Sequence, residues 1–201
     1  MRELAAALTS ADGICTVRGE SFSGGTFAGE IGNAVFVDVT FTGCRFTGAA
    51  LSGGEFSSCH FLRCDLSGAQ LENGYFSASE FRECKAVGTN FSVGVFRGAS
   101  FDGCAMRMAN FNGARLDHAR FASCVLEGAS LSGLRLRESS FSECDLSRAE
   151  LFGTLLAGMD LRGCTLRGIA LSDTLRELRG VTVDFAQAAE LIALLGVAVR
   201  P

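Results

Sequence analysis

Nine cysteines and two histidines are the residues of this 201-residue chain that could most readily bind a metal or act as nucleophiles. Seven of the cysteines recur at intervals of twenty residues, as Cys44, Cys64, Cys84, Cys104, Cys124, Cys144 and Cys164. A zinc site needs ligands that converge tetrahedrally. Residues that recur at one fixed interval are expected to stack in a line instead. We therefore expect these cysteines to act as small buried apolar residues, and we expect neither a metal nor a cofactor.

The elements that hold these cysteines follow a repeat of five residues. Every fifth residue from Ile31 to Leu171 is apolar, nearly always Phe or Leu, and only Ala86 among them is small. A small residue lies two places before most of these centres, and polar residues fill most other places. A period of five fits neither an α-helix, which needs 3.6, nor a flat strand, which needs 2.0.

Two inward positions in every five residues indicate a short extended side that ends in a turn. Gly occupies the last place in about half of the repeats, as expected if many corners need a positive φ. The motif Phe-x-x-Cys recurs every twenty residues, which is four pentads, so four sides make one coil. The pattern predicts an all-β solenoid of square cross-section, with a column of cysteines beside a column of phenylalanines.

The repeat is irregular at both ends. Val17, Phe22 and Phe27 are five residues apart but one residue out of phase with Ile31, so the first coils must absorb a deletion. The centre after Leu171 would be a charged arginine, which cannot point into a narrow apolar interior. We therefore expect an N-terminal cap segment at 1–16, a repeat domain at 17–174 and a C-terminal module at 175–201.

The C-terminal module contains a predicted helix. Asp184 and Gln187 form a capping pattern, Gly196 is a stop signal, and a short strand is expected at 197–199. The helix is apolar nearly all round, so one face can cover the open end of the solenoid while the surplus predicts a partner. A monomeric cap is the alternative to a symmetric dimer. The predicted dimer interface contains Phe185, Ala188, Ala189, Leu191, Ile192, Leu195, Val197 and Val199.

The outward charges differ between the sides of the predicted solenoid. The side centred on Leu51 and Leu71 carries Glu30, Glu72, Glu150 and Asp173 with no Lys or Arg, and we call it the acidic side. Its four carboxylates could equally be ordinary solvated residues. The side centred on Phe46 is mildly basic. A third side carries an apolar strip of Val35, Val37, Tyr75 and Val95, which could pack under the N-terminal segment.

The repeat units resemble those of pentapeptide-repeat proteins. The segments "CDLSR", "AELFG", "CTLRG" and "ANFNG" are similar to the unit of that family, and the resemblance covers residues 17–174. It implies a right-handed quadrilateral β-helix. The segment "VDFAQAAELIALLGVAV" is similar to the C-terminal module of the Qnr and MfpA group, whose members dimerise tail to tail through it.

The resemblance to this group implies a function. Its members bind type II topoisomerases, chiefly DNA gyrase, as rod-shaped mimics of duplex DNA, and protect them from quinolones or related poisons. Two rods joined at their C-termini would span roughly 80 Å, at about 4.8 Å per coil. The acidic side would then meet the DNA-binding surface of the enzyme as phosphates do. The phase from Ile31 to Leu171 leaves no room for inserted loops, so the chain is more similar to MfpA than to the loop-bearing Qnr proteins.

Other function classes are disfavoured. His60 and His118 fall at outward places on different sides, and no constellation for catalysis is evident, so we do not expect an enzyme. The net charge of −4 argues against direct nucleic-acid binding. The N-terminal apolar stretch is too short for a signal peptide and no transmembrane segment is evident, so we expect a cytoplasmic protein without disulfides. An adaptor rod with a different protein partner is the alternative function.

Overall fold

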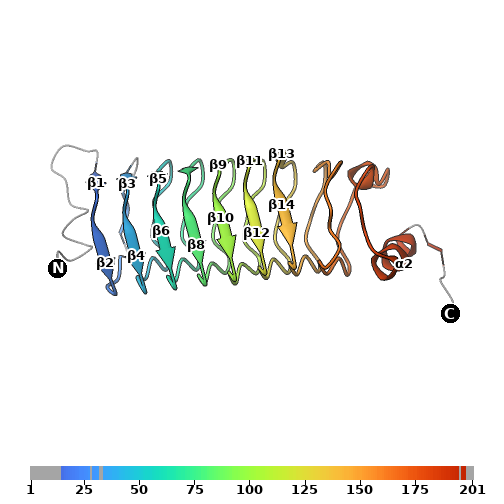
Figure 1. Cartoon of the computed structure of the whole chain (residues 1–201), viewed down its shortest axis with the longest axis horizontal. Helices are drawn as coiled ribbons and strands as arrows, with labels where there is room; N and C mark the ends of the chain where they lie inside the picture. The colour runs from blue at the N-terminus through green and yellow to red at the C-terminus, as the bar shows by residue number, and fades with distance from the viewer. Residues whose placement is uncertain (1–14, 28, 32–33, 195, 198–201) are drawn as a thin grey trace.

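The computed structural model describes residues 15–27, 29–31, 34–194 and 196–197, which form a rod (Figure 1). Two parallel sheets of seven strands run along it. The first contains β1 (Thr16–Arg18), β3 (Val35–Val37), β5 (Glu55–Ser57), β7 (Tyr75–Ser77), β9 (Val95–Arg97), β11 (Arg115–Asp117) and β13 (Arg135–Arg137). The second contains β2 (Ser21–Ser23), β4 (Thr40–Thr42), β6 (His60–Leu62), β8 (Glu80–Arg82), β10 (Ser100–Asp102), β12 (Arg120–Ala122) and β14 (Ser140–Ser142).

The other two sides of each coil pair through isolated β-bridges instead of three-residue strands. Asp65 pairs with Lys85 on one of these sides, and Asn90 pairs with Asn110 on the other. The paired residues are twenty apart, as they are between the strands from β3 to β14. The structure therefore confirms the predicted four-sided β-solenoid with a coil of twenty residues.

The first coil is one residue shorter than the others. Val17 lies opposite Phe36, an interval of nineteen residues. The bridge between Glu30 and Ala50 restores the interval of twenty. The deletion predicted from the phase of the repeat therefore falls between Thr26 and Glu30.

Phenylalanine rings stack along the axis of the rod and form its core. The ring centroids of Phe61 and Phe81 are 4.6 Å apart with an interplanar angle of 3°. Rings of neighbouring sides meet edge to face, as do Phe91 and Phe101 at 6.1 Å and 74°. Such pairs contribute about 0.5–1.5 kcal/mol each beyond the burial of their area. From Phe22 to Phe141 the core thus contains columns of rings with about the spacing of the strand ladder, 4.8 Å, and beyond Phe141 it is built from aliphatic residues such as Leu146 and Leu151.

The predicted interior column of cysteines is buried beside the rings. The Sγ atom of Cys84 donates a hydrogen bond to the carbonyl oxygen of Phe61 over 3.2 Å, and Cys104 donates to Phe81 over 3.3 Å. Burial raises the pKa of the neighbouring Cys59 thiol to about 11, which keeps it protonated at neutral pH. These thiols therefore fill the core as hydrogen-bond donors between successive coils.

The corners of the coil all adopt one backbone conformation between residues 43 and 168. The last residue of each pentad there has a positive φ, whether or not it is glycine. The sequence predicted a positive φ at many corners, whereas the structure has one at every corner in this range. The glycines mark only about half of these corners, because most of the others are occupied by residue types that do not favour a positive φ. Val93 is the most unfavourable case, since a β-branched residue at a φ of 55° is crowded by its own backbone.

Val93→Gly is expected to stabilise the protein. The left-handed conformation costs a non-glycine residue roughly 1–2 kcal/mol, whereas the extra chain entropy of glycine costs about 0.5–1 kcal/mol. The net gain in free energy of unfolding should be about 1 kcal/mol, measured by chemical denaturation. The matched control is Gly113→Val at the same corner of the next coil, where φ is +69°, and it should lower stability. A loss of stability in V93G would contradict this account of the corners.

The last coil is closed by the segment that follows the repeats. The 3-10 helix η1 (Arg176–Leu178) continues the backbone pairing, because the Leu156 N–H donates to the Glu177 carbonyl over 3.0 Å. A bridge between Asp160 and Thr182 extends the pairing further. The arginine that cannot point inward, Arg176, is exposed. The domain boundaries at 16 and 174 remain predictions, but the ladder itself extends to Thr182.

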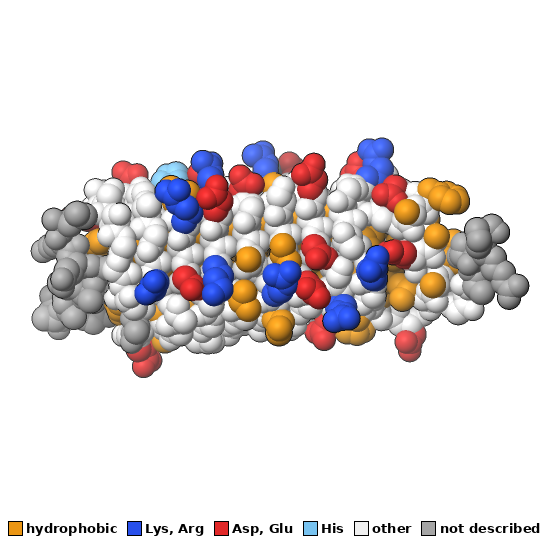
Figure 2. Space-filling model, turned by 90° about the horizontal axis from the view of Figure 1, so that it is seen from below, with side chains coloured by type: hydrophobic (Ala, Val, Ile, Leu, Met, Phe, Trp, Pro, Cys, Tyr) orange, Lys and Arg blue, Asp and Glu red, His pale blue; other side chains and the backbone are white. Residues whose placement is uncertain are grey.

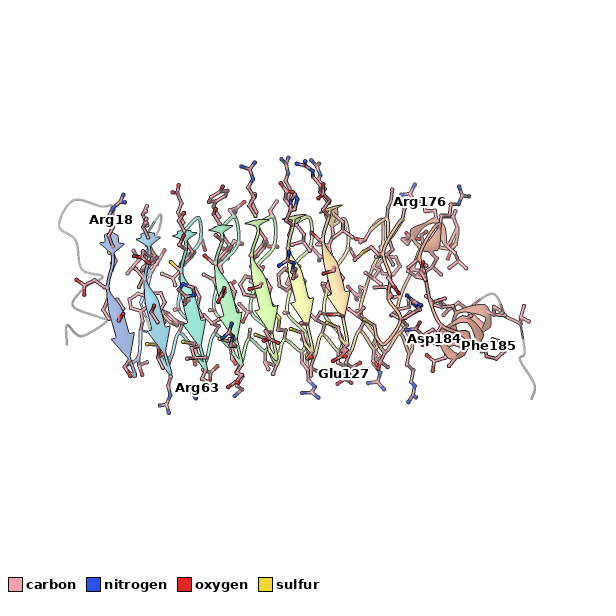
Figure 3. All side chains as sticks on the ribbon, viewed as in Figure 1. Arg18, Arg63, Glu127, Arg176, Asp184 and Phe185 are labelled. Atoms are coloured by element: carbon pink, nitrogen blue, oxygen red, sulfur yellow. The ribbon has the colours of Figure 1, made fainter. Side chains whose placement is uncertain are left out.

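Helix α2 (Phe185–Ala193) lies across the C-terminal end of the rod, where Figure 3 labels Asp184 and Phe185. The predicted capping pattern is present, with Asp184 and Gln187 each accepting a bond from the other's backbone N–H. The buried Gln187 side chain also donates to the carbonyls of Leu161 and Cys164, over 2.8 and 2.6 Å. One amide therefore starts the helix and satisfies acceptors that the open end of the solenoid would leave bare. The predicted strand at 197–199 falls largely outside the described residues.

A buried carboxylate fixes η1 against the rod. The Glu177 side chain accepts hydrogen bonds from the Gly153 N–H over 2.9 Å and from the Ser172 hydroxyl over 2.8 Å. Burial acts to raise the pKa of Glu177, but these bonds and those from backbone N–H groups outweigh it, and the pKa lies below its ordinary value of 4.5. The ionised form is therefore the one that the folded protein favours.

Glu177→Gln is expected to make stability less dependent on pH. Because the folded-state pKa is depressed, the stabilisation from Glu177 is fully present above its unfolded pKa and is lost as pH falls through the folded one. The unfolding temperature of the wild type should exceed that of E177Q at pH 7, and the gap should narrow below about pH 4.5. Glu83→Gln, at an exposed corner, is the control and should show no such narrowing. A gap that stays constant down to pH 3 would contradict this role.

Candidate functional site

The acidic side predicted from the sequence is a continuous side of the rod. Glu30 and Glu150 belong to one column, which runs through bridges at Ala50, Gln70, Asn90, Asn110 and Ser130. Six intervals of about 4.8 Å separate the two carboxylates, so they lie on the order of 29 Å apart. Glu72 lies in the column beside them, and Asp173 lies near the C-terminal end of this side. The four acids are thus spread along the rod and are not clustered.

An amide ladder separates the acids of this side. The Asn90 Nδ2 atom donates to Gln70 Oε1 over 3.1 Å, and Asn110 Nδ2 donates to Asn90 Oδ1 over 3.2 Å. These side chains repeat the strand spacing on the outside of the coil. The ladder gives this side a regular, neutral and polar middle, with negative charges at intervals.

The acids keep their charges available to a partner. Glu72 accepts hydrogen bonds from the Ser52 hydroxyl over 2.7 Å and the Asn90 amide over 3.3 Å, and Glu150 accepts one from Ser130 over 3.2 Å. These bonds orient the carboxylates without neutralising them. Within the part of the chain that the structure describes, no Lys, Arg or His forms an ion pair with Glu30, Glu72, Glu150 or Asp173.

The side centred on Phe46, predicted to be mildly basic, carries two ion pairs between adjacent coils. Lys85 lies 3.8 Å from Asp65, and Arg107 lies 3.0 Å from Glu127 in the following coil. Figure 2 shows the rod from below, with acidic and basic side chains interspersed along it and apolar side chains gathered near its C-terminal end. Opposite charges in adjacent coils therefore offset one another here, unlike on the acidic side.

The predicted dimer interface is only partly exposed. Phe185 is 92% exposed, and Ile192 and Val197 are 40% and 51% exposed. Ala188 and Ala189 are half-buried, whereas Leu191 is buried in the core of its own chain and does not contribute to the exposed surface. Leu195 and Val199 lie outside the described residues. Together with Leu194, which is 43% exposed, these residues give the C-terminal end several exposed apolar side chains.

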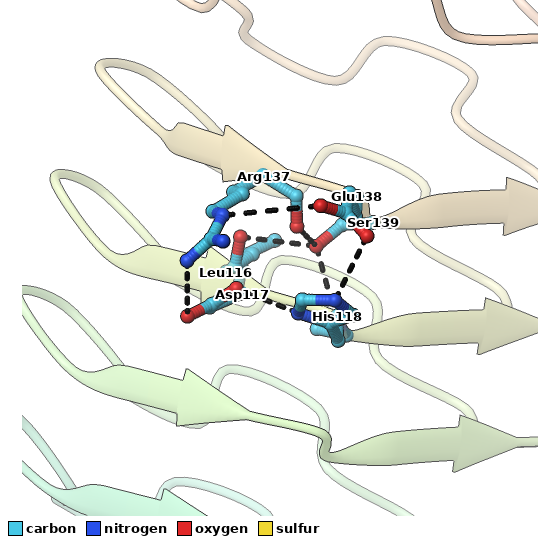
Figure 4. Close-up of polar contacts among 7 residues, drawn as sticks. Leu116, Asp117, His118, Arg137, Glu138 and Ser139 are labelled. Carbon is cyan, nitrogen blue, oxygen red and sulfur yellow. Dashed lines mark hydrogen bonds and ion pairs between the residues drawn. The ribbon is translucent and has the colours of Figure 1, made fainter.

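A cluster around His118 has the composition of a catalytic triad but not its geometry (Figure 4). The His118 ring nitrogens Nδ1 and Nε2 lie 2.7 Å from Asp117 and 2.9 Å from Glu138, so carboxylates occupy both. The Ser139 hydroxyl lies 3.0 Å from the carbonyl oxygens of Leu116 and Arg137, and it accepts a bond from a backbone N–H. A serine nucleophile would need a free imidazole nitrogen. This cluster instead links neighbouring coils.

The described part of the chain contains no candidate metal site and no helix that could span a membrane. No group of three or more His, Cys, Asp or Glu side chains comes together there in a way that could hold a metal ion. Its helices are also too short or too polar to cross a lipid bilayer.

Comparisons with solved structures found several similar chains. Full-length QnrB1, a plasmid-mediated fluoroquinolone resistance protein, is 20% identical with a TM-score of 0.38, over 90% of this chain and 100% of that one. The pentapeptide repeat protein Rfr23 from the cyanobacterium Cyanothece 51142 is 16% identical with a TM-score of 0.39, over 87% and 93%. HetL from Nostoc sp. strain PCC 7120, which is involved in heterocyst differentiation regulation, is 19% identical with a TM-score of 0.25, over 83% and 86%. No curated protein sequence matches the chain.

Family models match most of the repeat region. The model described as "Pentapeptide repeat region" matches residues 34–111 and 54–131, and the model described as "Pentapeptide repeats (8 copies)" matches residues 129–168. Together these matches extend without a gap from residue 34 to residue 168, which is well over half of the chain. With its twenty-residue coils and small buried positions, the chain belongs to the pentapeptide-repeat proteins.

Proposed function

We propose that this protein binds a bacterial type II topoisomerase, DNA gyrase or topoisomerase IV, in place of DNA. Binding would protect the enzyme from quinolone-like or natural-product poisons, as antibiotic resistance or self-immunity. Such a partner works in the cytoplasm, and the protein would act there without catalysing a reaction. The observation that carries the proposal is the acidic side, whose four carboxylates lie along an unbroken rod with no cationic partner in the described residues.

The shape of the rod supports this function. A DNA-binding surface is shaped for a long object of constant width that bears negative charge at intervals. The rod has constant width because its coils keep one register from Glu30 to Ala170. The hydrogen bonds to Glu72 and Glu150 hold these carboxylates in fixed positions, as a duplex holds its phosphates.

The C-terminal end supports a homodimer. The similarity of this segment to the module of the Qnr and MfpA group implies a tail-to-tail arrangement, and the exposed Phe185 ring lies at that end. A dimer would double the length of the rod and extend its acidic side. The alternative function is an adaptor rod that binds a different protein partner.

Neutralising the acidic side is expected to weaken topoisomerase binding. The variant Glu30→Gln, Glu72→Gln, Glu150→Gln and Asp173→Asn should bind gyrase at least ten-fold more weakly, because the charges that meet the basic surface are gone. The matched control neutralises four exposed acids on other sides: Glu55→Gln, Glu83→Gln, Asp102→Asn and Glu143→Gln. It makes the same change in net charge and should bind like the wild type. Affinity is measured by surface plasmon resonance at two salt concentrations, since exposed charges are screened by salt.

Equal loss in both four-site variants would show that net charge matters and not this side of the rod. Unchanged binding in the acidic-side variant would overturn the site. No binding by the wild type to gyrase or topoisomerase IV, with no effect on supercoiling in the presence of several poisons, would favour the adaptor.

Phe185→Asp is expected to yield a monomer. A charge in an apolar interface is costly to bury, whereas on the exposed monomer surface it costs little. Multi-angle light scattering should give 21.1 kDa for F185D and twice that mass for the wild type. Ala186→Asp, at an exposed neighbouring position, is the control for a charge on this helix. A wild type of 21.1 kDa would rule out the dimer in solution.

A further inference from the structure

A groove lined by arginines lies on the first sheet, on a different side from the acidic one. Its outward residues form two columns, Val95, Arg115 and Arg135 in one, and Arg97, Asp117 and Arg137 in the other. Between them lies a hollow of about 390 Å³, with Tyr75 at the end nearer the N-terminus. We call this surface the arginine groove. Figure 3 shows side chains with nitrogen atoms at their tips projecting from the rod at β9, β11 and β13.

Three of the four arginines of the groove, Arg97, Arg115 and Arg135, have no carboxylate partner among the described residues. Arg115 lies directly opposite Arg135 on the neighbouring strand. Like charges in this position repel and destabilise a sheet. Among the described residues, no carboxylate forms an ion pair with Arg97, Arg115 or Arg135. Arg137 alone has acidic neighbours, Asp117 at 3.7 Å and Glu138 at 4.0 Å.

This arrangement departs from the rest of the rod. Elsewhere an arginine or lysine often stacks on a carboxylate of the next coil, as Arg107 does on Glu127. In the arginine groove, Arg115 instead lies opposite Arg135 on the next strand, and both side chains are exposed. Like charges in this position are destabilising, and an anionic ligand bound between the two arginines would relieve the repulsion.

The shape of the groove favours one class of anion. The arginines span only β9 to β13, so they form a compact group and not the long stripe that a nucleic-acid backbone needs. The groove is bounded by Tyr75 and Val95 at one end, and this column continues as the exposed Leu155 beyond the other. Guanidinium groups bind carboxylates through paired hydrogen bonds, while the apolar ends fit an apolar side chain. We propose that the arginine groove binds a short acidic segment of a partner protein, with Asp or Glu side chains next to an aromatic or aliphatic residue.

The probe for this proposal is a fluorescein-labelled peptide of six glutamates followed by a phenylalanine, with fluorescence anisotropy as the readout. The full-length protein should bind it, and Arg115→Gln with Arg135→Gln should weaken binding at least ten-fold. Arg45→Gln with Arg120→Gln removes the same charge from two exposed arginines on other sides and should leave binding within two-fold. A peptide of six glutamines and a phenylalanine should not bind.

Thermal unfolding provides a second readout that needs no ligand. R115Q with R135Q should unfold about 1–3 °C higher than the wild type, because the repulsion is relieved. A lower unfolding temperature would show that the arginines stabilise the fold, and it would overturn the proposal. Failure of the acidic peptide to bind would also overturn it, as would tighter binding of a single-stranded oligonucleotide than of the peptide.

Discussion

From Ala50 to Ala170, each residue of a coil lies directly above the residue twenty positions earlier, at the spacing of the strand ladder. Most other features of the structure follow from that constraint. Inside the coil it favours identical residues, because flat rings stack on one another at 4.6 Å. Outside the coil it penalises identical charges, because like charges at about 4.8 Å repel. The same geometry that builds the core therefore restricts which charged surfaces the rod can carry without a loss of stability.

The exceptions to charge alternation are informative for this reason. Lys85 and Arg107 stack on acids of adjacent coils. The acidic side avoids repulsion differently, by separating its carboxylates with an amide ladder through Asn90. Arg115 and Arg135 are neither paired with an acid of an adjacent coil nor separated by an uncharged residue, so their repulsion remains. The rod thus has an acidic side with carboxylates that form no ion pair in the described residues. It also has a short arginine groove, on a different side, in which three of the four arginines form none.

Much of this fold could be predicted from the sequence because large apolar, small and polar residues each occupy fixed places in the pentad. Large apolar residues at a period of five fix the inward positions, and the shift of phase before Ile31 located the short first coil. The corners could not be predicted fully, since the fold imposes a positive φ on Val93 that its residue type opposes. The dual role of Gln187 was missed because the capping pattern says nothing of its bonds to distant carbonyls.

The candidate sites were less predictable than the fold. The acidic side could be found by sorting charges into columns, and its carboxylates lie on one side as expected. The apolar strip at Tyr75 and Val95 predicts a packing surface on this side and gives no sign of the arginine groove. The same column continues with Arg115 on β11 and Arg135 on β13, and these residues carry the signal for the groove. Burial of Leu191 could not be foreseen, because a helix that is apolar all round does not show which face meets its own rod.

The central claim is that the rod occupies the place of DNA on a topoisomerase. Its most direct test is competition: gyrase is saturated with a fluorescently labelled duplex, the protein is titrated in, and the anisotropy of the duplex is followed. The account predicts that the duplex is displaced completely, and that more protein is required when the duplex concentration is raised. A ternary complex, in which the protein binds gyrase while the duplex stays bound, would contradict it.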